Sequence, residues 1–142
     1  MSAVAQLVRD AMVPDPHTLD VGASAQEAGE ALMRPEVRSV LVTDGGRLTG
    51  VITRKTLVRE VVARGLDPGA TKLGAIAEPP NATIESAMPL GDAFAFMEEQ
   101  DFERVPVIEN GKLVGVLSRA VVQRRLAEDE PPSAGDEAGD AV

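Results

Sequence analysis

The sequence predicts an α+β fold in which two pseudo-symmetric β-α-β-β-α repeats pack together through their sheets. The segment Val37–Val61 can be laid over Phe102–Leu126 without a gap, at a constant offset of 65 residues. Glycines, hairpin turn and apolar pattern coincide in the two copies, which indicates a duplicated unit. A unit of about 60 residues cannot bury its sheet alone, so the two repeats should share a core. The identical pairs are Val40/Val105, Val42/Val107, Gly46/Gly111, Leu48/Leu113, Gly50/Gly115, Val51/Val116, Arg54/Arg119 and Arg59/Arg124.

Each repeat opens with a short extended piece that leads into a helix. In the first repeat, Ser24 and Glu27 have the spacing of a capping box, which predicts a helix through about Met33. In the second repeat, Pro89 occupies the predicted first helical turn, and that helix runs to about Gln100. The extended pieces are Thr18-Leu19 and Thr83-Ile84.

A β-hairpin follows each of these helices. The predicted strands 38–43 and 48–52 flank the letters DGGR, and the predicted strands 104–108 and 113–117 flank ENGK. Gly-Gly and Asn-Gly supply the positive φ angles that tight hairpin turns require. The strands are rich in valine and nearly continuous in apolar residues, so both of their faces should be covered.

A second helix ends each repeat, over 54–64 before Gly65 and over 119–127 before Pro131. A short N-terminal helix over 3–12 has its counterpart at 71–77 in the second repeat. The predicted division of the chain is therefore residues 1–66 for the first repeat with its N-terminal helix, 67–128 for the second repeat, and 129–142 for a tail. The tail is acidic and rich in Pro, Gly and Ser, which predicts disorder.

Composition excludes several classes of function. The net charge of −9 and the aromatic content of 2% make nucleic acid a poor partner, since that needs basic or stacking surfaces. With no cysteine and one histidine, His17, we expect neither a thiolate nucleophile nor a metal centre. The chain has no run of about eighteen apolar residues and no signal-peptide pattern, so we expect a cytoplasmic protein without a membrane partner. No catalytic constellation is recognisable.

The duplicated order resembles a family. Two tandem β-α-β-β-α units, each with glycine, two apolar residues, Ser or Thr and arginine before a helix (GVITR at 50–54, GVLSR at 115–119), look like a pair of cystathionine-β-synthase (CBS) domains. The Val105-Pro106-Val107 strand strengthens the resemblance, which covers about residues 5–127. It implies a regulatory module, usually a homodimer, that binds AMP, ADP, ATP or S-adenosylmethionine between the repeats and signals to a partner protein.

The resemblance also implies site residues. The hydroxyl residue of each motif contacts phosphate with help from the next arginine, and the pre-helix piece and first hairpin strand contact the base. An aspartate three residues after the hydroxyl holds the ribose, but Thr56 and Val121 stand at that position here. The implied ligand-binding residues are Thr18, Leu19, Val40, Val42, Thr53, Arg54, Thr56, Thr83, Ile84, Val105, Pro106, Ser118 and Arg119.

Two interpretations of these residues remain open. A Thr or Ser between a strand and a helix offers its hydroxyl and free backbone N–H groups to an anion, or it simply caps the helix. Thr56 can replace the missing carboxylate with one neutral hydrogen bond and Val121 with none, so the first-repeat site should be the better one. The alternative to a ligand-sensing module is a ligand-free dimerisation or interaction module.

Overall fold

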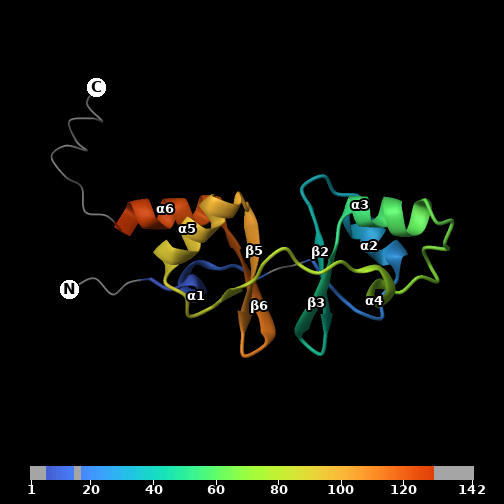
Figure 1. The fold of residues 1–142 in the computed structure, drawn as a ribbon, viewed down its shortest axis with the longest axis horizontal. Helices are drawn as coiled ribbons and strands as arrows, with labels where there is room; N and C mark the ends of the chain where they lie inside the picture. Colours follow the sequence, from blue (N-terminus) through green and yellow to red (C-terminus); the bar gives the residue numbers. More distant parts are fainter. Residues whose placement is uncertain (1–5, 15–16, 130–142) are drawn as a thin grey trace, which may run out of the picture.

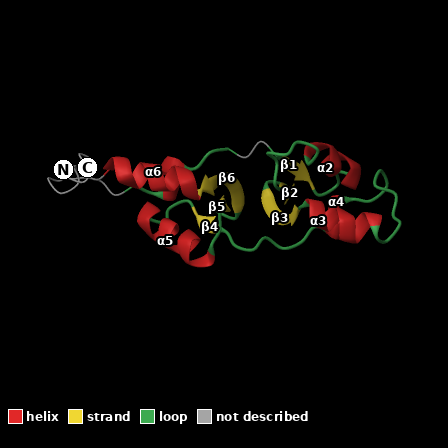
Figure 2. Cartoon of the chain, turned by 90° about the horizontal axis from the view of Figure 1, so that it is seen from above, coloured by secondary structure: helices red, strands yellow, loops and turns green. Residues whose placement is uncertain are grey.

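The structure, a computed structural model, describes residues 6–14 and 17–129. Two sheets stand face to face at the centre of the molecule, and helices lie at its two outer ends (Figures 1 and 2). The first repeat contains β1 (Thr18–Asp20), α2 (Ala25–Ala31), β2 (Val40–Asp44), β3 (Arg47–Ile52), α3 (Arg54–Leu57) and the π-helical turn η1 (Val58–Val62). The second contains β4 (Ile84–Glu85), α5 (Leu90–Gln100), β5 (Arg104–Glu109), β6 (Lys112–Ser118) and α6 (Arg119–Asp129). The short helices α1 (Val8–Ala11) and α4 (Leu73–Ile76) precede the two repeats.

The two sheets have the same topology. Their strand orders are β1-β2-β3 and β4-β5-β6, with the first pair parallel and the second pair antiparallel. Each hairpin has a register shift at the same place, after Val42 in β2 and after Val107 in β5. The two hairpins also touch, because the Leu113 amide donates to the Gly46 carbonyl at 2.9 Å. The predicted α+β fold of two repeats packed through their sheets is confirmed.

The hairpin turns form as the sequence predicts. Gly45 and Gly46 have φ angles of 60° and 87°, and Asn110 and Gly111 have 53° and 81°. Two consecutive positive φ angles define the turn whose twist matches an antiparallel hairpin. The glycine and asparagine letters therefore fix both hairpin registers.

Several helix boundaries differ from the predicted ones. The Ser24–Glu27 capping box is present, with the Glu27 amide donating to Ser24 Oγ at 3.2 Å, but α2 ends at Ala31 rather than Met33. Pro89 is the residue before α5 rather than its first residue. The helix predicted over 54–64 starts as α3 and widens into the π-helical turn η1, and Gly65 follows it with a φ of 68°. The spacing of apolar side chains predicts which face of a helix is buried, but it does not predict a local change from α-helix to π-helix.

The short helices are exchanged between the repeats. Val8 and Ala11 of α1 lie in the core of the second repeat, and Leu73 and Ile76 of α4 lie in the core of the first. Equivalent hydrogen bonds hold them at 2.9 Å: the Val8 amide donates to the Met88 carbonyl, and the Leu73 amide to the Ala23 carbonyl. The sequence analysis grouped the N-terminal helix with the first repeat (residues 1–66), but in the structure this helix packs on the second repeat.

Some predictions lie at or beyond the limits of the described residues. The start of the predicted N-terminal helix lies outside them, and so does the acidic tail apart from Asp129, which ends α6. Among the helices that the structure describes, none is long and apolar enough to cross a bilayer.

Candidate functional site

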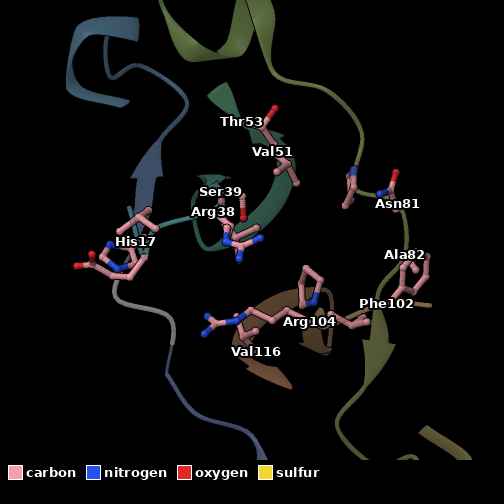
Figure 3. Close-up of a pocket in the computed structure, with 16 residues that line it drawn as sticks. His17, Arg38, Ser39, Val51, Thr53, Asn81, Ala82, Phe102, Arg104 and Val116 are labelled. Atoms are coloured by element: carbon pink, nitrogen blue, oxygen red, sulfur yellow. The ribbon is translucent and has the colours of Figure 1, made fainter. Parts of the chain in front are cut away.

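A cavity of about 520 Å³ lies between the two repeats. Its walls come from the loop before β2 (36–39), the segment before β4 (80–82), the loop before β5 and the ends of β3 and β6. The volume falls in the range of about 300–1,000 Å³ that is common for small-molecule sites. Figure 3 shows its lining residues, which the two repeats supply together.

The two repeats contribute equivalent residues to the wall of the cavity. Val51 and Val116 are equivalent positions and both line it, as do Leu41 and Pro106. These residues give it apolar walls from both sheets. The polar lining is not symmetric, however: Thr53 contributes, whereas its equivalent Ser118 is not among the lining residues.

Three of the predicted site residues line this cavity: Thr53, Val105 and Pro106. The others do not, and four of them are completely or almost completely buried, namely Val40, Val42, Thr56 and Ile84. Their side chains belong to the packed interior of the repeats rather than to the cavity wall. The remaining predicted residues outside the lining are Thr18, Leu19, Arg54, Thr83, Ser118 and Arg119.

Thr53 and Thr56 belong to a polar network at the start of α3. The Thr53 hydroxyl accepts from the Thr56 amide at 3.3 Å, and the two hydroxyl oxygens lie 3.0 Å apart. Thr56 Oγ1 donates to Glu78 Oε1 at 2.9 Å, and Arg59 forms an ion pair with Glu78. A carboxylate from the inter-repeat segment thus stands next to the position where the family resemblance implies aspartate. The equivalent positions in the second repeat are Ser118, Val121 and Val13, which cannot form this network.

Arg54 and Arg119 hold the ends of the preceding helices. Arg54 Nη2 donates to the carbonyl of Leu32 at 2.6 Å and to that of Arg34 at 2.8 Å. Arg119 Nη1 reaches the equivalent carbonyl, that of Met97, at 3.5 Å. A cation at a helix C-terminus satisfies carbonyls that have no partner within the helix. The repeated arginine of the motif therefore ties each strand-to-helix junction to the helix before it.

The sequence interpretation missed the charged residues of the cavity. Arg38 and Arg104 line it, together with Glu36 and His17, and Figure 3 shows both arginines reaching into the same space. The sequence analysis assigned no ligand-binding role to His17, Glu36, Arg38 or Arg104. The available signal was an arginine at the first residue of the predicted hairpin strand in each repeat, Arg38 in 38–43 and Arg104 in 104–108.

The family is settled by comparison of the sequence with known families. The model described as "CBS domain" matches residues 8–63 and 73–128. The chain belongs to the CBS domain family. CBS domains are regulatory modules, not catalysts.

Hypoxic response protein 1 of Mycobacterium tuberculosis is 33% identical over 85 residues, which are 60% of this chain and 59% of that relative's length. CBS domain-containing protein YhcV of Bacillus subtilis is 25% identical over 111 residues, 78% of this chain and 79% of that protein.

Solved structures agree with this CBS assignment. Hypoxic Response Protein I with two coordinated zinc ions has a TM-score of 0.70 at 24% identity, covering 84% of this chain and 98% of that chain. CBSX2 of Arabidopsis thaliana in complex with AMP has a TM-score of 0.67 at 26% identity, covering 86% and 96%. Within the part of the present chain that the structure describes, no group of three or more His, Cys, Asp or Glu could hold a metal ion.

Proposed function

We propose that this CBS pair is a regulatory module that binds an adenine nucleotide in the cavity between its repeats. The observation that carries the proposal is the cavity itself, because both repeats build it and it combines apolar walls with cationic side chains. Val51, Val116 and Pro106 offer surfaces for a base, while Arg38 and Arg104 suit a phosphate. The AMP complex of the similar protein CBSX2 supports the same ligand class.

Signalling then follows from differential binding. A ligand that touches both repeats favours the relative arrangement of the repeats that it fits best, and it shifts the population toward that arrangement. A partner protein that binds one arrangement better than the other would respond to the ligand. The exchanged helices α1 and α4 give each repeat a direct mechanical connection to the other.

A thermal-shift measurement with AMP, ADP, ATP and S-adenosylmethionine tests this proposal. A ligand at 100 times its dissociation constant stabilises the folded state by about 2.7 kcal/mol. For a chain of this size, that corresponds to a rise of roughly 5–10 °C in the melting temperature. GTP serves as the control for recognition of the base. The absence of any shift at millimolar adenine nucleotide would contradict the proposal.

A second candidate, a ligand-free dimerisation module, is favoured by a different observation. Met33, which follows α2, and Val58 and Val62, which lie in η1, are 78%, 57% and 71% exposed, and beside them lies an apolar groove. Contiguous exposed apolar surface marks interaction sites. The equivalent positions in the second repeat are Glu98, Gln123 and Ala127, so the described part of the second repeat has no such patch at these positions.

The occupant that fits this patch is a second copy of the chain. Helix α2 carries Glu27 and Glu30 and no basic residue, whereas α3 and η1 carry three basic residues, Arg54, Lys55 and Arg59, and one acidic residue, Glu60. In a two-fold contact, α2 of one copy can face α3 and η1 of the other, which pairs opposite charges around an apolar centre. The proposed homodimer therefore joins first repeat to first repeat.

Val58→Glu is expected to weaken this homodimer at least tenfold, because it buries a charge against apolar surface. Sedimentation velocity over a range of protein concentrations measures the dissociation constant. Gln123→Glu, at the equivalent position of the second repeat, is the matched control and should leave it unchanged. A monomeric wild type, or equal weakening by both substitutions, would rule out this interface.

A further inference from the structure

A chain of hydrogen bonds runs from the wall of the cavity to a carboxylate outside it. Thr53 lines the cavity, and Figure 3 shows its side chain at one end of that space. The Thr53 hydroxyl oxygen lies 3.0 Å from that of Thr56, and the Thr56 hydroxyl donates to Glu78 Oε1 at 2.9 Å. Thr56 is completely buried, and neither Thr56 nor Glu78 lines the cavity. The side chains of these two residues therefore act on the cavity through the Thr53 hydroxyl.

The direction of each bond in this chain follows from the donors and acceptors that are present. An ionised carboxylate only accepts, so the single proton of the Thr56 hydroxyl goes to Glu78. Thr56 Oγ1 also accepts from the Thr53 amide at 3.1 Å. With its proton used, Thr56 can only accept from the Thr53 hydroxyl across their 3.0 Å contact. The Thr53 proton is thus directed at Thr56 and not at the cavity.

The same three side chains have a second arrangement. If Thr53 turns its proton to an acceptor in the cavity, Thr56 keeps the bond between the two hydroxyls only by donating to Thr53. Glu78 then loses its hydroxyl donor and keeps its ion pair with Arg59 of η1. In the empty protein the first arrangement is favoured, because a hydrogen bond to a charged acceptor is stronger than one to a neutral acceptor. A ligand oxygen stabilises only the second arrangement, so the chain is a two-state element that a ligand biases.

The second repeat cannot form this chain. Its equivalents of Thr53, Thr56 and Glu78 are Ser118, Val121 and Val13, and neither valine has a polar side-chain atom. The segments that contain Glu78 and Val13 otherwise cross β3 and β6 in the same way, through two backbone hydrogen bonds each. The carboxylate is therefore an addition to a crossing that both repeats share, which points to a role beyond holding the segment in place.

We propose that Glu78 is a positioning residue that opposes occupation of the cavity, because it holds the proton of Thr53 through Thr56. This proposal rests on the proposed nucleotide-binding function and concerns the regulation of that site. A ligand oxygen that accepts from Thr53 must first displace the contact with Thr56, so the chain lowers the affinity for such a ligand. By linkage, the ligand weakens the hold on Glu78 in turn. Since Glu78 also pairs with Arg59, this carboxylate connects the cavity wall with η1.

Thr56→Val tests the proposal without a change of charge. Valine cannot accept from the Thr53 hydroxyl, so the proton becomes free for the ligand. AMP should then bind about 3- to 10-fold more tightly, the equivalent of about one neutral hydrogen bond. A merely structural Thr56 would give the opposite sign, since the loss of its buried hydrogen bonds would loosen the cavity wall. Isothermal titration measures the affinities.

Two further proteins show whether Thr56 acts through Thr53. In the Thr53→Val background, Thr56→Val should no longer change the affinity for AMP, because the proton that it releases is absent. Thr49→Val is the matched control in the otherwise wild-type protein. It removes a hydroxyl that donates to the Val42 carbonyl and does not line the cavity, so it should leave the affinity unchanged.

Glu78→Gln is a second test that does not alter the buried threonine. The Glu78 side chain is 42% exposed, so this substitution should not prevent folding. A neutral amide oxygen is a weaker acceptor than a carboxylate, so AMP should bind about 2- to 5-fold more tightly. Glu60→Gln makes the same change of charge at a residue of η1 that pairs with Arg64, and it should have no such effect.

The outcomes separate this proposal from the proposed function. Unchanged or weaker binding of AMP by Thr56→Val overturns the proposal and leaves nucleotide binding in place. A gain that persists without the Thr53 hydroxyl, or equal effects of Glu78→Gln and Glu60→Gln, has the same consequence. Failure of both the wild type and Thr56→Val to bind AMP overturns the proposal and the proposed function together.

Discussion

Leu73→Ala is expected to lower the free energy of unfolding by about 2–5 kcal/mol, the usual cost of a large-to-small change in a core. Leu73 lies in the segment between the repeats, where a linker residue would ordinarily be exposed. Instead it is completely buried in the core of the first repeat. Denaturant unfolding followed by circular dichroism measures the loss.

Leu66→Ala is the matched control for this substitution. Leu66 lies in the same inter-repeat segment but is 37% exposed, so its truncation should cost well under half as much. Equal effects of the two substitutions would show that α4 does not pack as described. Val8→Ala, at the position equivalent to Leu73, should destabilise as well, because Val8 is buried in the core of the second repeat.

Because α1 and α4 are exchanged, we expect the repeats not to behave as separate domains. Each helix has four residues, too short to be stable without tertiary packing. Each gains that packing from the other repeat, so the core of one repeat includes chain that precedes the other. Unfolding of either repeat therefore removes core contacts from its partner, and we expect the two to unfold together.

The order of elements could be predicted from the sequence because its signals are local. The capping box at Ser24 and Glu27 and the glycines of the two turns act within a few residues, and both formed as predicted. The repeat at a constant offset then extended each assignment from one copy to the other. The exchange of the short helices is not local, since the apolar residues of α4 would satisfy the core of either repeat.

The site was predicted less completely than the fold. Thr53, Val105 and Pro106 line the cavity, but the residues on either side of them in the motif turned out to serve capping and packing. Arg54 illustrates the difficulty: a motif arginine next to a hydroxyl residue suits an anion, and it equally suits the carbonyls of Leu32 and Arg34 that only the folded chain brings within reach. The loops before β2 and β5 have no regular pattern, so nothing in their spacing indicated a cavity.

The carboxylate beside Thr56 is a second feature of the site that depends on tertiary structure and could not be predicted from the motif. The sequence has threonine where the resemblance implies aspartate, which indicated a loss of negative charge. In the structure, Glu78 accepts from the Thr56 hydroxyl and pairs with Arg59. Glu78 is 22 residues further along the chain, so the negative charge at this position comes from a residue that the fold brings close and not from the motif itself. The second repeat has Val13 at the equivalent of Glu78 and retains no such group.

Gly50→Ala is expected to destabilise the protein by about 1–3 kcal/mol, although alanine is the smallest possible change. A Cβ atom at Gly50 would lie 2.6 Å from the Ala77 Cβ and 3.1 Å from the Glu78 carbonyl oxygen. The chain that leaves α4 passes directly over β3 at this point, where Val51 and Glu78 exchange backbone hydrogen bonds of 2.8 and 3.0 Å. Alanine would force the crossing segment away from the strand.

Two measurements distinguish this close approach from a general effect of glycine replacement. Gly91→Ala, in helix α5 with nothing near its added Cβ, should stabilise the protein by about 0.5–1 kcal/mol, because alanine is the better helix former. In Gly50→Ala, hydrogen exchange of the Val51 and Glu78 amides should become faster, since their mutual bonds are lost first. A Gly50→Ala protein as stable and as protected as the wild type would contradict the close approach of residues 77–78 to β3.

The same geometry recurs at Gly115, where an added Cβ would lie 2.8 Å from the Val13 carbonyl oxygen. The repeated glycine of the two motifs is thus required by the chain that passes over it from the other repeat.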